Sequence, residues 1–206
     1  AQDGLGARLS VASAALVTPD RALARRVAAA LGRWNLEFDD SGGDALTDTS
    51  AGIFARLAAE AAANGLEPPT LLALLKHPLC RLGGAHGAFK SAIEVLELAL
   101  LRGTRPQAGS SGLARDLSRF RQELTKLCKG ETSSLHRAEP RAGLTNEELD
   151  LAQALVELLR KALAPLESLG ASKPHDFAEL ATRHRDVLLE LSRDPDGVAV
   201  AFDAPQ

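Results

Sequence analysis

Residues 14–43 carry a pattern that the rest of the chain does not repeat. A short apolar run at 14–18 stops at Pro19 and Asp20, and an Ala- and Arg-rich segment with apolar residues at helical spacing follows it. Residues 35–39 then alternate polar and apolar, as a half-buried strand does. Most of the chain from residue 49 to residue 195 has a helical pattern. We therefore expect a mainly α protein: a small β-α-β edge followed by a helical bundle.

The two expected strands would be parallel neighbours, because a helical crossover joins parallel strands. Two strands are too few for a stable sheet. The unit is therefore expected to be the edge of a larger sheet whose other strands lie outside these residues. The chain has no methionine, including at position 1, which we interpret as a piece of a longer protein.

About five or six helices are expected between residues 49 and 195, which we interpret as one helical domain after an opening domain at 1–48. Ser91 with Glu94, and Thr145 with Glu148, have the spacing of capping boxes. Pro165 should kink or fray the helix that begins near Thr145. Residues 129–142 lack apolar periodicity and predict a mobile loop. The tail at 196–206 resembles a returning strand.

The composition excludes some classes of function. Aromatic residues make up only 3% of the chain, so Leu, Ala and Val must build the core, and the net charge of −3 argues against a uniformly basic nucleic-acid binder. A local basic face remains open. Cys80 and Cys128 are too few for a disulfide framework and are expected to be reduced thiols of a cytoplasmic protein. No apolar run reaches the ~20 residues that span a bilayer, so no membrane partner is expected.

Several motifs fall short of a site. Residues 83–91 (GGAHGAFKS) resemble a phosphate-binding loop, but the glycine spacing is wrong and Phe89 precedes Lys90. Two sets of possible metal ligands lack a convincing spacing: His77, Cys80 and His86, and the acidic residues Asp39, Asp40, Asp44 and Asp48. We expect no catalytic, cofactor or metal site within these residues.

Four arginines near the expected strand-to-helix turn are more informative. Their side chains lie off the apolar stripe of the helix, where they form either an ordinary exposed face or a contact surface for a phosphate backbone. They are Arg21, Arg25, Arg26 and Arg33.

The run at 14–43, continued by AGIFARLAAEAA at 51–62 and LLALLKHPLCRLG at 71–83, resembles the AddB subunit of bacterial double-strand-break repair helicase–nucleases. The order of segments is similar to UvrD-like helicases more generally. The resemblance covers residues 14–103 well and the later helices only in their layout. It implies that the β-α-β piece belongs to the second RecA-like motor domain, and that the helices form a bundle inserted into it.

The resemblance also implies a function. Such complexes unwind and resect broken DNA ends for homologous recombination, using ATP and Mg in the parent complex and an AddA-type helicase–nuclease partner subunit. Neither a nucleotide-binding motif nor a PD-(D/E)xK nuclease motif occurs here, so this part would guide DNA or pack against the partner. The DNA-contacting residues would be Thr18, Arg21 and Arg25, then Arg26 and Arg33. Trp34 would either stack on a base or lie in the core.

Two alternatives from other classes stay open. A helical protein-interaction module without a nucleic-acid role would fit the net negative charge and the Leu- and Ala-rich faces. A small enzyme with a site near residues 39–48 would require a bound divalent ion or carboxylates with shifted pKa values.

Overall fold

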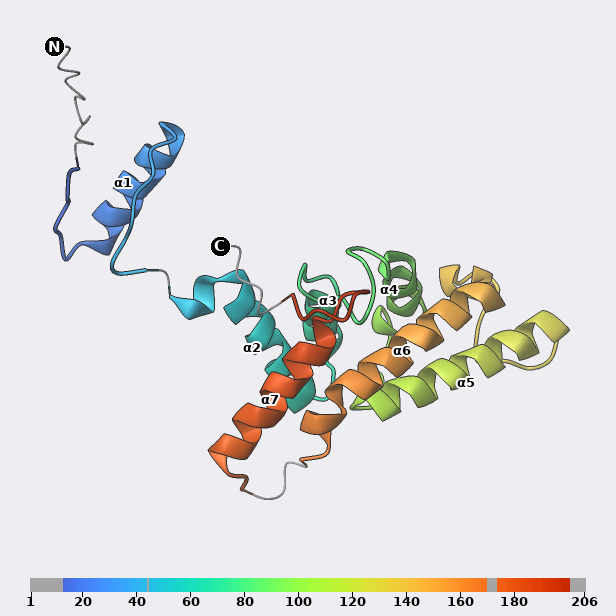
Figure 1. Cartoon of the computed structure of the whole chain (residues 1–206). Helices are drawn as coiled ribbons and strands as arrows, with labels where there is room; N and C mark the ends of the chain where they lie inside the picture. Colours follow the sequence, from blue (N-terminus) through green and yellow to red (C-terminus); the bar gives the residue numbers. More distant parts are fainter. Residues whose placement is uncertain (1–12, 44, 170–173, 201–206) are drawn as a thin grey trace, which may run out of the picture. The chain divides into compact units, whose positions relative to one another are not determined.

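The computed structural model describes residues 13–43, 45–169 and 174–200. The described residues form seven α-helices (Figure 1), and the chain divides into two compact units between Gly43 and Asp44. The expectation of a mainly helical protein is confirmed. Within the described ranges, no helix combines the length and the apolar character needed to cross a membrane.

In residues 13–43, the described part of the first unit, the chain forms one helix, α1 (Arg21–Arg33). The carboxylate of Asp20 accepts hydrogen bonds from the amides of Ala22 and Leu23, so it caps the N-terminus as an N-cap aspartate does. At the other end, Asn35 has a φ of 53° and the amide of Leu36 donates to the carbonyl of Leu31. This is a Schellman ending with asparagine as the left-handed residue.

The expected β-α-β edge does not form within the described residues. Residues 14–18 and 35–39 are irregular, and Val17 is 94% exposed. Neither segment has a neighbouring backbone with which to form a ladder of hydrogen bonds, and an extended segment without such a ladder is not a strand. The prediction of two parallel strands in this chain is therefore wrong.

The return segment 35–43 instead runs back along α1 (Figure 1). The guanidinium of Arg21 donates two hydrogen bonds of 3.0 Å to the carboxylate of Asp40 and one of 2.7 Å to the carbonyl of Gly43. A paired, two-point contact of this kind fixes direction as well as distance. It joins the return segment to the start of the helix.

The second unit holds the other six α-helices. They are α2 (Ser50–Ala63), α3 (Pro68–Leu75), α4 (Lys90–Leu96), α5 (Ser110–Lys129), α6 (Asn146–Glu167) and α7 (Phe177–Leu191). A π-helical turn, Glu97–Leu101, extends α4, and short 3-10 turns occupy Leu46–Asp48 and Pro140–Gly143.

Helix α6 is the centre of this unit, because α2, α4, α5 and α7 all pack against it (Figure 1). Its buried side chains recur at the three- and four-residue spacing of one helix face. They are Leu149, Ala152, Leu155, Val156, Leu159, Ala162 and Leu163. Because each helix buries its apolar face against this row, the core is continuous.

The two expected capping boxes differ in outcome. The Thr145 hydroxyl accepts from the amide of Glu148, whose carboxylate accepts from the amide of Thr145, so this box is confirmed. Helix α4 begins two residues earlier than expected, and Ser91 lies inside it without a capping hydrogen bond. Pro165 falls in the last turn of α6, which ends at Glu167.

The segment expected to be a mobile loop at 129–142 has fixed contacts instead. The carboxylate of Glu123 on α5 accepts hydrogen bonds from the Lys126 ammonium, from the amide and hydroxyl of Ser134, and from the hydroxyl of Ser133. These donors lower the pKa of Glu123 to about 2, Lys126 having the largest effect. Leu135 beyond them is buried.

The expected C-terminal strand is not formed by the residues that can be described. Residues 193–200 make a tight turn with one isolated antiparallel bridge between Arg193 and Ala199, and residues 201–206 lie outside the described part. The α3–α4 loop docks at this end of α7. The amides of Arg81 and Leu82 donate to the carbonyl of Leu191, which would otherwise lack a partner at the helix C-terminus.

Replacing Leu159 by alanine is expected to lower the free energy of unfolding by about 2–5 kcal/mol, because the side chain is fully buried on α6. The adjacent Leu158 is 36% exposed, so Leu158→Ala should cost under about 1 kcal/mol. Urea unfolding of both variants checks the orientation of α6. Equal losses would contradict it.

Glu167 acts as a tertiary cap for α5, whose own N-cap residue is Gly109 and has no acceptor side chain. The Glu167 carboxylate accepts hydrogen bonds from the amide and the hydroxyl of Ser110. Glu167→Gln should lower the free energy of unfolding by about 1–2 kcal/mol. The matched control Glu157→Gln removes an exposed carboxylate that bonds Arg160 within α6, and should change it by under about 0.5 kcal/mol.

Candidate functional site

The arginines of α1 divide into one that is engaged and three that are free. Arg21 is half-buried and bound to Asp40, and its guanidinium holds the pKa of that carboxyl below the usual range. Arg25, Arg26 and Arg33 are exposed, and no side chain among the described residues forms a hydrogen bond or ion pair with them. These three cations are therefore available to an external anion.

Thr18 lies beside a negative charge rather than beside free amides. Its hydroxyl accepts a hydrogen bond from the amide of Asp20, and the Asp20 carboxylate occupies the first amides of α1. The Asp20 carboxylate would repel another anion at this helix N-terminus. Thr18 and Arg21 thus have structural partners, and their role in DNA contact stays a prediction.

Trp34 ends α1 and is 78% exposed, so the expectation that it lies in the core is not met by the described residues. Leu36 and Phe38 on the return segment are also at least half exposed. Arg26 and Arg33 border a shallow apolar depression formed by Leu23, Val27 and Ala30. The first unit therefore presents cations, an aromatic ring and an apolar stripe, and α1 has no buried residue.

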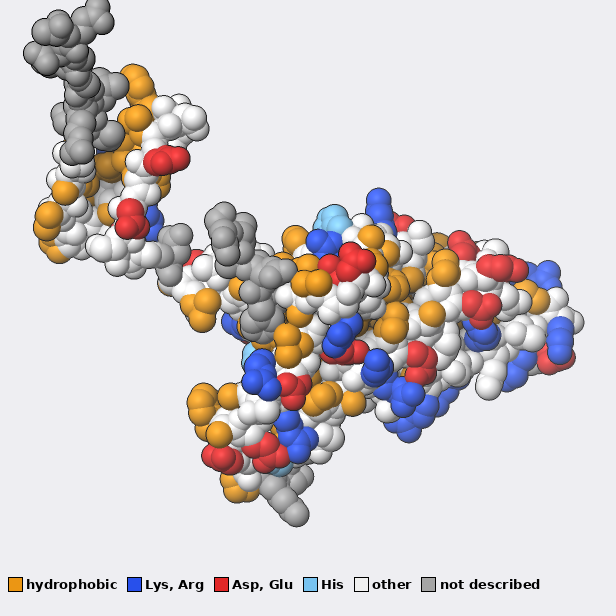
Figure 2. All heavy atoms as spheres, in the orientation of Figure 1, with side chains coloured by type: hydrophobic (Ala, Val, Ile, Leu, Met, Phe, Trp, Pro, Cys, Tyr) orange, Lys and Arg blue, Asp and Glu red, His pale blue; other side chains and the backbone are white. Residues whose placement is uncertain are grey.

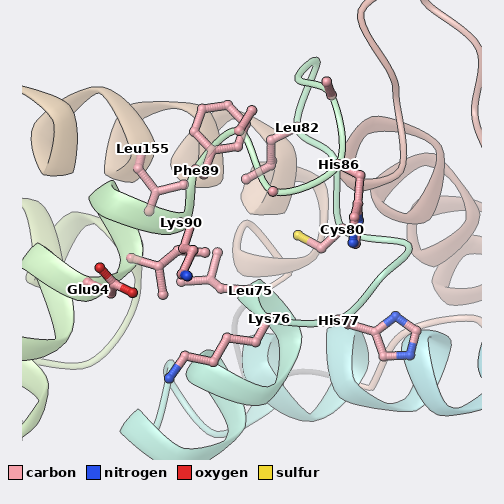
Figure 3. Close-up of a pocket in the computed structure, with 14 residues that line it drawn as sticks. Leu75, Lys76, His77, Cys80, Leu82, His86, Phe89, Lys90, Glu94 and Leu155 are labelled. Carbon is pink, nitrogen blue, oxygen red and sulfur yellow. The ribbon is translucent and has the colours of Figure 1, made fainter.

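The second unit contains a cavity of about 290 Å³ between the α3–α4 loop and helices α3, α4 and α6 (Figure 3). Apolar side chains make most of its wall, among them Leu75, Leu82, Phe89, Ile93 and Leu155. Lys76, Lys90 and Glu94 line it as well. Lys76 is already committed to an ion pair with Glu97 at 2.8 Å.

His77 and Cys80 line this cavity but do not converge on a metal position. The His77 ring stacks on Phe54 at a centroid distance of 5.2 Å, and its Nδ1 accepts from the amide of Leu79. Figure 3 shows the ring turned away from the Cys80 thiol. Burial lowers the pKa of His77. Across the part of the chain that the structure describes, no three His, Cys, Asp or Glu side chains come together as metal ligands.

The acidic residues after α1 are also dispersed. Asp40 bonds Arg21, Asp48 belongs to the short turn before α2, and Asp44 lies outside the described residues. The pKa of Asp40 is lowered, in the direction that an ion pair gives and opposite to that of a general acid. The alternative of a small enzyme at residues 39–48 thus lacks a convergent group among the residues that can be described.

A row of cations on α5 was not among the expected site residues. The apolar face of α5, which includes Leu117, Phe120 and Leu124, belongs to the core. The signal for the opposite face was present in the sequence, as basic residues spaced by four, seven and three positions from Arg115 to Lys129.

No protein-family model, curated protein or solved structure matches this chain.

The two cysteines should differ strongly toward a thiol reagent at neutral pH. Cys128 is exposed, whereas the apolar surroundings of Cys80 desolvate its thiol and raise the pKa to about 12, and only the thiolate reacts. A disulfide reagent should therefore titrate one thiol rapidly and the other slowly. Cys128→Ser should remove the rapid phase and Cys80→Ser should leave it; two rapid phases would contradict the packing of the α3–α4 loop.

Proposed function

We propose that this chain is a non-catalytic, helical part of an AddB-like subunit of a DNA double-strand-break repair helicase–nuclease. It would guide DNA and pack against neighbouring parts of the complex during end resection. ATP and Mg would act in the parent complex, with an AddA-type subunit as partner, in the cytoplasm. Residues 1–48 would belong to the second RecA-like motor domain of that subunit.

The observation that carries the DNA role is the combination of Arg25, Arg26 and Arg33 with Trp34 on one short unit. The arginines have no partner among the described residues, and the indole ring is largely exposed. Cations attract phosphates, and an exposed aromatic ring stacks on an unpaired base. The three arginines and the exposed indole ring together suit contact with single-stranded nucleic acid.

The packing role is supported by the apolar stripe of α1. Leu23 is 39% exposed and Val27 is half-buried, although both lie on the face that a helix normally buries. A unit without a core of its own gains stability when another body covers such a stripe.

The single tryptophan of the chain permits a site-specific test. A single-stranded oligonucleotide should quench Trp34 fluorescence, and the variant Arg25→Gln/Arg26→Gln/Arg33→Gln should bind it about tenfold more weakly at low salt. Fluorescence anisotropy across a salt series measures the affinity, with forked DNA as a second probe. Arg56→Gln/Arg160→Gln/Arg185→Gln is the matched control, because it removes the same charge from exposed positions of the second unit.

Binding without quenching, and without loss in the triple variant, would contradict the role of α1 in DNA contact. If the chain binds no DNA even at low salt, the DNA role fails as a whole.

The second candidate, a helical protein-interaction module, is favoured by a different surface. An apolar groove of about 590 Å³ lies between α2, the end of α6 and the start of α7. It is lined by Ala59, Leu166, Leu180 and Phe177, the last of which is 82% exposed. A stable protein complex that DNA does not displace, and that Phe177→Ser abolishes, would support this candidate.

A further inference from the structure

Helix α5 presents a row of four basic side chains on the face opposite to its buried residues. Residues three, four and seven apart share one side of a helix. Lys and Arg side chains follow the edge of the second unit that α5 forms (Figure 2). The members of this α5 cationic row are Arg115, Arg119, Lys126 and Lys129, and all four are exposed.

The two acidic residues of α5 are turned toward the flanking loops. The Asp116 carboxylate accepts a hydrogen bond of 2.7 Å from the amide of Gln107, before the helix. The Glu123 carboxylate accepts one of 2.7 Å from the amide of Ser134, after the helix. Each carboxylate is thus partly engaged by a backbone amide, which weakens its attraction for the basic side chains of α5.

The row keeps an excess of positive charge. Arg119 lies 3.6 Å from Asp116, and Lys126 lies 2.6 Å from Glu123. Arg115 and Lys129 have no acidic partner among the described residues; the Arg115 guanidinium donates only to the carbonyl of Ser111, at 3.3 Å. Helix α5 has five basic and two acidic residues, although the net charge of the chain is −3.

The residues between the cations are polar and neutral. Ser118, Gln122 and Thr125 are exposed on the same side of α5. The hydroxyls of Ser118 and Thr125 donate to carbonyls of the preceding turn, so the Gln122 amide is the neutral side chain of this face that can donate to a phosphate oxygen. Phe120, the aromatic residue of α5, is 5% exposed and belongs to the core. The face can therefore contact a backbone but offers no aromatic ring on which a base could stack.

We propose that the α5 cationic row binds the phosphodiester backbone of a nucleic acid, as a second contact surface besides α1. From Arg115 to Lys129 the row is about 21 Å long, which matches about six phosphates of one strand of a duplex. The contact is independent of base sequence. This inference rests on the proposed DNA role and assigns a separate surface to it.

The test compares two variants of the full chain with the same change in charge. The row variant is Arg115→Gln/Arg119→Gln/Lys126→Gln/Lys129→Gln. The control variant is Arg56→Gln/Arg160→Gln/Lys161→Gln/Arg185→Gln, which removes exposed cations from α2, α6 and α7. Circular dichroism checks that both keep the helical content. Anisotropy is measured across a salt series with a 5′-labelled single strand, with a duplex of about 30 base pairs, and with polyglutamate of equal charge.

The row variant should bind DNA at least tenfold more weakly at low salt. Its plot of log Kd against log salt should lose about 0.7 of slope for each contact removed on a single strand, or about 0.9 on a duplex. The control should lose much less. Dividing the loss of slope in each arm by its value per contact gives the number of phosphates that the row contacts on each form of DNA.

Four results would overturn the inference. If the parent chain binds DNA and the row variant binds it equally well, the α5 surface is excluded while the DNA role of α1 stands. Equal losses in both variants would show a dependence on net charge alone. If polyglutamate binds as tightly as DNA, with the same loss in the row variant, the surface fits an acidic protein instead. A parent chain that binds no DNA would end both proposals.

Discussion

The second unit depends on the apolar row along α6. Leu155 and Leu159 at its middle are fully buried, and four other helices bury their own apolar faces against the same helix. Burial of a leucine contributes about 1.5–3 kcal/mol, so this row supplies much of the energy that offsets the ordering of the chain. The outer face of α5 is free to carry charge because its inner face already lies on α6.

The first unit has the opposite character. It buries no residue of α1, and the Arg21–Asp40 pair joins its return segment to the helix. An exposed ion pair stabilises a fold only weakly, while Trp34 and the apolar stripe remain open to solvent. A surface of this composition suits a unit that another body covers, and it is consistent with the proposed place of the chain in a larger DNA-processing protein.

Local patterns could be predicted, and contacts between distant residues could not. The boundaries of α2 follow from Thr49 and Asn64 at its ends, and the capping box at Thr145 involves residues three positions apart. By contrast, the carboxylate of Glu167 reaches Ser110 across 57 positions. For the candidate site, exposure of the α1 arginines follows from their positions off the apolar stripe. The engagement of Arg21 depends on Asp40, 19 residues away, and has no local signal.

The sequence by itself determined which segments become helices and which side each helix buries, because both depend on residues within a few positions of one another. Only the tertiary structure decided which charges remain free. Arg21 and Lys76 are paired with carboxylates from other segments, whereas Arg25 and Arg115 have no acidic partner among the described residues. Strand formation also could not be predicted from the sequence, because a strand forms only when a second backbone lies beside it.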